Sequence, residues 1–164
     1  MIYGFNAGEV FKIAIEIEQN GWDFYEKAQA KIDDSAVKGI FAELAAEEIK
    51  HKARFKALMD ELPESTTGST VWDPDNEIDQ YLKMMADMHV FSKNASVDEL
   101  LASINGALEA LKLAMQFEKD SIVFFAEMQN LAESGENKDK IGQLVKEEQQ
   151  HLKRLSMQYM KLKN

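Results

Sequence analysis

The sequence predicts an all-α protein, a bundle of four long helices with a long crossover between the second and third. Its 164 residues include two prolines and eight glycines, which suits long helices because both residue types destabilise a helix interior. Along four segments apolar residues recur every three or four positions, the spacing of one helix face. The chain also repeats itself at an offset of one hundred positions, which indicates two similar helix pairs in one domain over residues 1–164.

The first helix pair is read from two apolar stripes and the turn between them. A stripe over residues 11–32 predicts the first helix, and a stripe over 41–62 predicts the second. The short polar turn at 32–35 indicates that the two helices are antiparallel. Pro63 is expected to end the second helix, since proline cannot continue one.

The crossover is expected to cover residues 63–95 and to include one short helix over about 77–91. It lets the third long helix begin far from the point where the second ends. The packing face of the short helix is expected to be formed by Met84, Met85 and Met88. His89 is interpreted as their lone polar neighbour, because no other candidate ligand converges on it.

The second helix pair is predicted in the same way as the first. Ser96 and Glu99 form a capping box that is expected to open the third long helix. Its apolar stripe runs over 100–125, a turn follows at 134–137, and a last stripe over 141–162 predicts the fourth helix.

Six polar residues stand in apolar stripes where hydrophobic side chains are expected: Glu18, Glu48, His51, Glu118, Glu148 and His151. The last three repeat the first three at the hundred-residue offset. Each Glu-x-x-His pair lies on one helix face, because residues three apart are neighbours on a helix. Glu47 and Glu147 lie about 100° around the helix, on the flank of the stripe. A pairing of the histidines with these two flanking acids stays open.

Four carboxylates at core depth are costly unless cations compensate their charge. Two divalent cations would cancel four glutamates, with two neutral imidazoles completing the ligand set. One Glu from each of two helices plus Glu-x-x-His from each of the other two is the ligand set of di-iron and di-manganese bundles. One such motif could be a surface ion pair, but the duplicated set within apolar stripes favours a site for two metals. Iron, manganese and zinc all accept these ligands.

Composition excludes several other functions. There is no cysteine, so the sequence predicts neither disulfides nor iron–sulfur centres. The net charge of −10 argues against nucleic-acid binding, which requires basic residues. The N-terminus resembles no signal peptide, and no segment is apolar and long enough to span a membrane. A soluble cytoplasmic protein is therefore expected.

With these motifs, the sequence resembles the di-iron domain of rubrerythrins and their ferritin-like relatives over nearly its whole length. The resemblance implies a ferritin-like bundle with two iron ions, bridged by Glu48 and Glu148. It also implies that Glu18 and Glu118 are terminal ligands and that His51 and His151 each bind one metal. Tyr25, two turns from Glu18 on the same face, is either a partner of a ligating carboxylate or a core tyrosine.

The sequence departs from the rubrerythrin pattern at two points. It has no cysteine for the rubredoxin domain that rubrerythrins commonly contain. Rubrerythrins also have a further glutamate three residues after the ligand of the third helix. Here Ser121 occupies that position, and Gly21 is its counterpart in the repeat. These small residues suggest room for an oxidant or solvent beside the metals.

The leading hypothesis is a di-iron oxidoreductase that reduces hydrogen peroxide or dioxygen. Its electrons would come from a partner protein of rubredoxin or flavin type, since the sequence offers no second redox centre. The alternative is a ferroxidase or iron-handling protein, with iron as the substrate. A third reading is an interaction module with a structural metal pair, and a homodimer is the expected assembly.

Overall fold

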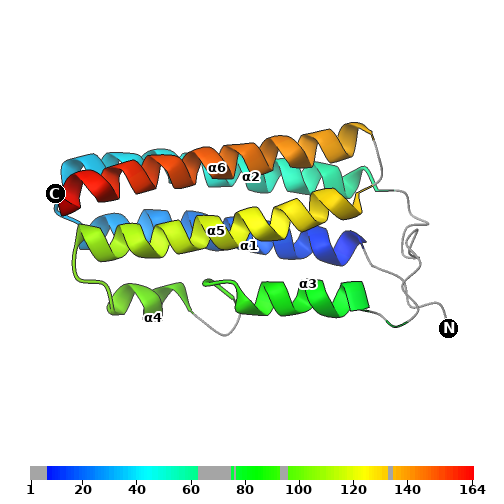
Figure 1. Ribbon diagram of the computed structural model, residues 1–164, viewed down its shortest axis with the longest axis horizontal. Helices are drawn as coiled ribbons and strands as arrows, with labels where there is room; N and C mark the ends of the chain where they lie inside the picture. The colour runs from blue at the N-terminus through cyan, green and yellow to red at the C-terminus, as the bar shows by residue number, and fades with distance from the viewer. Residues whose placement is uncertain (1–6, 63–74, 76, 93–95, 133–134) are drawn as a thin grey trace.

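Four long helices form the body of the protein in the computed structural model, which describes residues 7–62, 75, 77–92, 96–132 and 135–164. They are α1 (Ala7–Ala28), α2 (Ser35–Asp60), α5 (Ala107–Leu131) and α6 (Glu136–Lys163). α1 packs along α2 and α5 packs along α6, so each half of the repeat forms one hairpin (Figure 1). The two hairpins face each other, and the predicted four-helix bundle is confirmed. No helix among the described residues is long and apolar enough to cross a bilayer.

The turn inside the first hairpin is short. A 3₁₀ turn, η1 (Gln29–Lys31), follows α1 directly. Asp34 then caps α2, since its side chain accepts a hydrogen bond of 2.9 Å from the N–H of Val37. The predicted turn at 32–35 is therefore confirmed, whereas Pro63 lies outside the described residues.

α2 and α5 run in the same direction. Near one end of the bundle the ring centroid of Phe55 in α2 lies 4.7 Å from that of Phe125 in α5. Near the other end Tyr25 contacts Phe41 of α2 and Phe117 of α5, at 5.1 and 6.0 Å. Parallel neighbours need a connection that returns along the whole bundle. That requirement explains the long crossover.

The crossover contains two helices in the described residues, α3 (Glu77–Met88) and α4 (Val97–Ala102), which lie along α1 and α5 (Figure 1). The prediction that Ser96 opens the third long helix was wrong. Ser96 precedes α4, but its side chain makes no capping hydrogen bond. α5 begins instead after Gly106, whose φ of 88° favours glycine and interrupts the helical path.

The packing face assigned to α3 was wrong at two of its three methionines, whereas Met85 is partly buried against the core as predicted. Met84 is 50% exposed and Met88 is 74% exposed, whereas the buried residue of α3 is Leu82. α3 ends at Met88, so His89 and Phe91 lie in a non-helical segment, and both are buried. Two large side chains of the crossover thus pack into the bundle after α3 has ended.

The core consists of two aromatic clusters with a polar layer between them. One cluster is formed by Phe24, Tyr25, Phe41, Phe91 and Phe117. The other is formed by Phe11, Phe55, Phe124 and Phe125. These rings exclude water from both ends of the polar layer, which strengthens electrostatic interactions inside it.

At Gly21 of α1 the ring of Phe117 in α5 packs against the backbone, and a side chain at this position would collide with it. A Cβ atom at position 21 would lie 2.4 Å from Cζ of the buried Phe117. Gly21→Ala is expected to lower the free energy of unfolding by about 1–3 kcal/mol, the usual effect of overpacking. Denaturant unfolding monitored by circular dichroism measures the change.

Gly39 provides the matched control, because it lies in the exposed part of α2 with no atom within 4 Å of its own added Cβ. Gly39→Ala is expected to raise stability by about 0.5–1 kcal/mol through helix propensity. Equal effects of the two substitutions would contradict the close packing at Gly21.

Candidate metal centre

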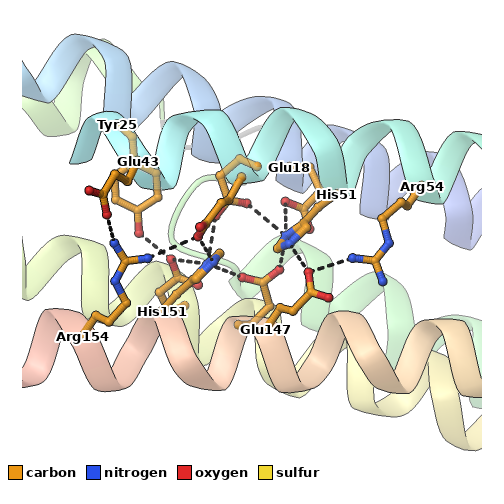
Figure 2. A network of polar contacts seen from close by, with 12 residues as sticks. Glu18, Tyr25, Glu43, His51, Arg54, Glu147, His151 and Arg154 are labelled. Carbon is orange, nitrogen blue, oxygen red and sulfur yellow. Dashed lines mark hydrogen bonds and ion pairs between the residues drawn. The ribbon is translucent and has the colours of Figure 1, made fainter. Parts of the chain in front are cut away.

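The structure brings the six predicted residues together in the polar layer of the core (Figure 2). One comes from each of α1 and α5, and two come from each of α2 and α6: Glu18, Glu118, Glu48 with His51, and Glu148 with His151. None of them is more than 3% exposed. All six face the core because they occupy positions in the apolar stripes of their helices.

The six residues form two overlapping groups that could each hold one metal ion. One group is Glu18, Glu48, His51 and Glu148, and the other is Glu48, Glu118, Glu148 and His151. Within each group the possible ligand atoms lie within 4.8 Å of one another. Glu48 and Glu148 belong to both groups.

The shared glutamates face both histidines. Oε1 of Glu148 lies 2.6 Å from Nδ1 of His51, and its Oε2 lies 2.9 Å from Nδ1 of His151. The two oxygens of Glu48 lie 3.9 and 3.3 Å from the same two nitrogens. Each carboxylate therefore offers one oxygen to each side, as a ligand between two metal ions would.

The atoms that could bind metal in the cluster are not satisfied by hydrogen bonds. Among the described residues, nine buried side-chain nitrogen and oxygen atoms make no well-oriented hydrogen bond, although some of them lie at ion-pair distance from one another, and all nine belong to these six residues. They include both oxygens of Glu18, Glu48 and Glu148 and Nδ1 of both histidines. A buried polar atom without a partner costs free energy. Two divalent cations would satisfy these atoms and cancel four carboxylate charges, so the residues fit a pair of metal ions.

Electrostatics within the cluster show the same need for positive charge. Burial, together with the charges of Glu48 and Glu148, raises the pKa of Glu18 well above its usual value. Burial also raises the pKa of Glu118, although contact with His151 opposes the change. Without metal, these carboxyl groups thus tend to keep their protons.

The histidines take the role of cations in the metal-free cluster. Burial alone would lower the pKa of His151, but its contacts with Glu118, Glu148 and Glu48 outweigh burial and raise it. Burial likewise opposes ionisation of Glu148, yet the two imidazoles lower its pKa to about 2. Protons on the imidazoles thus partly compensate the carboxylates in the metal-free protein.

Glu47 and Glu147 contact the histidines from outside the cluster, which the sequence left open. Nε2 of His51 donates to Oε2 of Glu147 at 2.8 Å, across from α2 to α6. Nε2 of His151 in α6 likewise lies 2.7 Å from Oε2 of Glu47 in α2. Each outer acid fixes the ring so that Nδ1 points into the cluster, an arrangement that commonly supports metal-bound histidine. Neither acid is in the two groups of possible ligands.

Two arginines, which sequence reasoning had not assigned to the site, extend these contacts (Figure 2). Arg54 donates to Glu147 at 2.7 Å, and Arg154 donates to Glu47 at 3.3 Å and also to Glu43. Burial would raise the pKa of Glu147, but Arg54 and His51 lower it. The repeat was the available signal, since Glu47 and Arg54 recur as Glu147 and Arg154.

Tyr25 contacts the cluster on one side only. Its buried hydroxyl donates a hydrogen bond of 2.5 Å to Oε1 of Glu118 on the facing helix. The repeat places Phe125 at the equivalent position, where no hydroxyl exists. The two halves of the cluster therefore differ in hydrogen bonding, although their possible ligands are the same.

The expectation of free space beside Gly21 and Ser121 was wrong. The ring of Phe117 fills the space over Gly21. Ser121 is 1% exposed, and its Oγ lies 3.1 Å from Nε2 of His89. The crossover thus supplies the side chain that occupies this side of the cluster.

Comparison with known proteins gives the class of this chain. Residues 9–159 match the model of the Rubrerythrin family. Since this match covers most of the sequence, the chain belongs to the rubrerythrin family. A comparison with curated proteins gives no significant match.

A solved structure has the same fold. It is a Thermotoga maritima protein assigned as ferritin-like and diiron-carboxylate, with a TM-score of 0.75 and 20% sequence identity. The alignment covers 96% of each chain. At this identity the similarity shows the fold, and the ferritin-like bundle is confirmed.

The outer acids lead to a prediction on metal affinity. Glu147→Ala removes the acceptor of His51 Nε2, and the loss of such a partner is expected to weaken metal binding by about 10–100-fold. Glu147→Gln keeps an acceptor and should have a smaller effect. Competition between the protein and a chelator for cobalt(II), followed by absorbance, measures the affinity.

Glu136→Ala is the control for this measurement, because Glu136 is an exposed residue of α6 that forms an ion pair with Lys140. Its affinity for cobalt(II) should equal that of the unmodified protein. An unchanged affinity in Glu147→Ala would show that His51 needs no support from α6.

The charges of the cluster predict how stability depends on pH. The folded pKa values of Glu18, Glu118 and His151 are raised above ordinary values of 4.5, 4.5 and 6.5. Above these ordinary values the folded metal-free protein binds more protons than the unfolded chain. Its free energy of unfolding should therefore fall as pH rises from about 5 to about 8.

Zinc-loaded protein should show the opposite trend, because metal binding releases protons and strengthens as pH rises. Thermal unfolding at several pH values, with EDTA or with zinc, makes the comparison. Parallel pH profiles in the two conditions would show that metal does not replace protons in the cluster.

Proposed function

We propose that this protein is a non-haem di-iron oxidoreductase that reduces hydrogen peroxide or dioxygen with electrons from a partner protein. The observation that supports this most strongly is the arrangement of the shared glutamates. Glu48 and Glu148 each direct one oxygen toward each imidazole, and their oxygens have no hydrogen-bond partner. Membership of the rubrerythrin family and the diiron-carboxylate assignment of the structural relative support iron as the metal.

In this proposal the six residues hold two iron ions. Glu18 and His51 would bind one ion, Glu118 and His151 would bind the other, and Glu48 and Glu148 would be shared. Two ferrous ions supply two electrons, and with two protons these convert one hydrogen peroxide into two waters. Manganese or zinc would satisfy the same ligands, but zinc has no accessible redox change.

The side chains around the ligands determine how the centre tolerates a change of charge. Glu147 and Glu47 hold the imidazoles through Nε2, so the rings keep their orientation when the charge at Nδ1 changes. Tyr25 donates to Glu118 and stabilises its ionised form on one side. The aromatic clusters above and below exclude water that would compete for the ligands.

Electrons for the centre would come from another protein. The sequence contains no cysteine and so no second iron centre of rubredoxin type. An external rubredoxin-like or flavin protein would reduce the centre after each turnover. A homodimer and a cytoplasmic location also stay predictions.

A ferroxidase, in which ferrous iron is the substrate, is the competing proposal. The same ligands would serve both activities, and stoichiometry separates them. An oxidoreductase keeps its two irons and cycles their charge, whereas a ferroxidase oxidises iron beyond two per chain.

Stopped-flow spectroscopy of protein loaded anaerobically with ferrous iron tests the proposal. The expected result is oxidation limited to two irons per chain, with hydrogen peroxide or dioxygen, followed by re-reduction by an added donor. Glu148→Gln should lose at least one of the two irons, because it removes a charge shared by both positions. Exposed Glu136→Gln is the control and should bind two.

Three results would change this conclusion. Oxidation that continues far beyond two irons per chain would support the ferroxidase. If no added electron donor reduces the oxidised centre, the protein does not turn over as a catalyst. The absence of tight, stoichiometric iron would exclude both activities.

A further inference from the structure

The segment that follows α3 crosses the seam between α1 and α5 and is called the strap here, residues 89–92. It lies level with Glu18 and Glu118, because it contacts α1 and α5 two to three residues beyond them. Its hydrogen bonds to the two helices include His89 Nε2 to Ser121 Oγ at 3.1 Å, Val90 N–H to Asp120 Oδ2 at 2.9 Å, and Asn20 Nδ2 to the Phe91 carbonyl at 2.9 Å.

A pocket of about 440 Å³ lies directly outside the strap. α1, α3 and the strap form its walls, and both His89 and Phe91 line it. Ile17, the neighbour of Glu18 in α1, is also part of its lining. α3 lies on the side of the bundle formed by α1 and α5 (Figure 1), so the pocket between α1 and α3 lies on that side of the cluster, next to the strap.

His89 and Ser121 are unusual among the buried residues. Apart from Tyr25, the buried polar side chains in the described residues are the six members of the cluster and these two. They bond to each other within an aromatic wall, where the rings of His89 and Phe117 are 5.4 Å apart and those of Phe91 and Phe117 are 5.2 Å apart. A fully apolar contact would close the seam without the cost of burying polar groups.

The hydrogen bonds of His89 define its protonation. Nδ1 accepts from the N–H of Phe91 at 3.3 Å, so the ring proton is on Nε2 and is donated to Ser121. Burial lowers the pKa of His89 to about 4, and the ring is neutral at physiological pH. The hydrogen bond to Ser121 is therefore a neutral one, of the modest strength that thermal motion can break.

We propose that the pocket is the entrance to the metal centre for a small uncharged polar molecule, and that the His89–Ser121 hydrogen bond controls opening of the strap. That this molecule is hydrogen peroxide rests on the proposed function. When the strap moves outward, the two polar groups become partners for such a molecule as it passes the aromatic wall. Charged side chains such as Lys12, Glu16 and Lys83 line the pocket itself. Ions are disfavoured beyond it, at the aromatic wall, because Phe91 and Phe117 cannot replace their hydration.

The opposite side of the cluster is closed in a different way. Over α2 and α6, Arg54 and Arg154 bind the outer acids, and those acids bind the histidines. Opening that side would break ion pairs and release the imidazoles that bind metal. Opening the strap breaks hydrogen bonds between neutral groups and one hydrogen bond to the carboxylate of Asp120. It leaves every possible ligand in place.

Control of access has a kinetic consequence that separates it from an effect on the metals. Faster opening of the strap speeds both arrival and departure of a ligand by the same factor, so its Kd stays constant. A residue that acts on the metal centre itself changes the Kd. The ratio of the two rates therefore distinguishes the roles.

Nitric oxide binding to ferrous-loaded protein, followed anaerobically by stopped-flow absorbance, measures both rates. Ser121→Ala removes the acceptor of His89, and both rate constants should rise about fivefold, the effect of one lost hydrogen bond. Ser156→Ala is the matched control, since Ser156 lies in α6 and bonds to Leu152 and Met115. It should leave both rates unchanged.

A substitution that fills the pocket should act in the opposite direction. Ile13 lines the pocket on α1, and Ile13→Trp is expected to slow nitric oxide association and dissociation together. Unchanged rates in both Ser121→Ala and Ile13→Trp would overturn the proposal. A changed Kd in Ser121→Ala would also overturn it, because Ser121 would then act on the centre.

Hydrogen exchange of the metal-free protein tests the strap without iron. The N–H groups of Val90 and Phe91 are bonded to Asp120 and His89, so their exchange reports opening. Ser121→Ala should accelerate both about fivefold and leave α2 and α6 unchanged. Equal exchange in the two proteins would refute control by Ser121, whereas a protein that takes up no iron would refute the proposed function alone.

Discussion

The burial of four carboxylates in the centre of a helical bundle is the constraint on which the rest of the structure depends. Each buried charge costs several kcal/mol unless it is compensated, and protein side chains supply two imidazoles against Glu18, Glu48, Glu118 and Glu148. The aromatic clusters increase this cost by excluding water. For the same reason they strengthen the attraction between the carboxylates and any cation that binds. A bundle built this way is complete only with positive charge in its core, so metal binding and folding are coupled.

Duplication produces a symmetric ligand set, and the crossover makes its surroundings asymmetric. The two hairpins contribute equivalent acids and histidines, and each outer acid contacts the histidine of the other hairpin. The crossover helices α3 and α4 lie along α1 and α5 (Figure 1), and His89 and Phe91 pack on that side of the cluster. Tyr25 adds a second asymmetry by bonding Glu118. The two groups of possible ligands therefore have the same residue types in different environments.

The cluster is closed by charge on one side and by aromatic packing on the other. Over α2 and α6, ion pairs that include Arg54 and Arg154 orient the imidazoles (Figure 2). Over α1 and α5, a short non-helical segment covers the seam with Phe91 and with hydrogen bonds to Asn20, Asp120 and Ser121. The first arrangement suits a permanent support and the second suits a reversible opening.

The sequence by itself determined the helices, the hairpins and the six residues of the cluster, because helical periodicity and an internal repeat are local properties of the chain. It misplaced the start of α5, because Ser96 precedes the separate short helix α4, which ends at Ala102, and α5 begins only after Gly106, whose positive φ depends on backbone geometry. It also missed the packing of His89 and the filled space over Gly21. Only the tertiary structure decided these points, because they depend on contacts between segments far apart in sequence, and no periodicity records which distant side chain fills a given space.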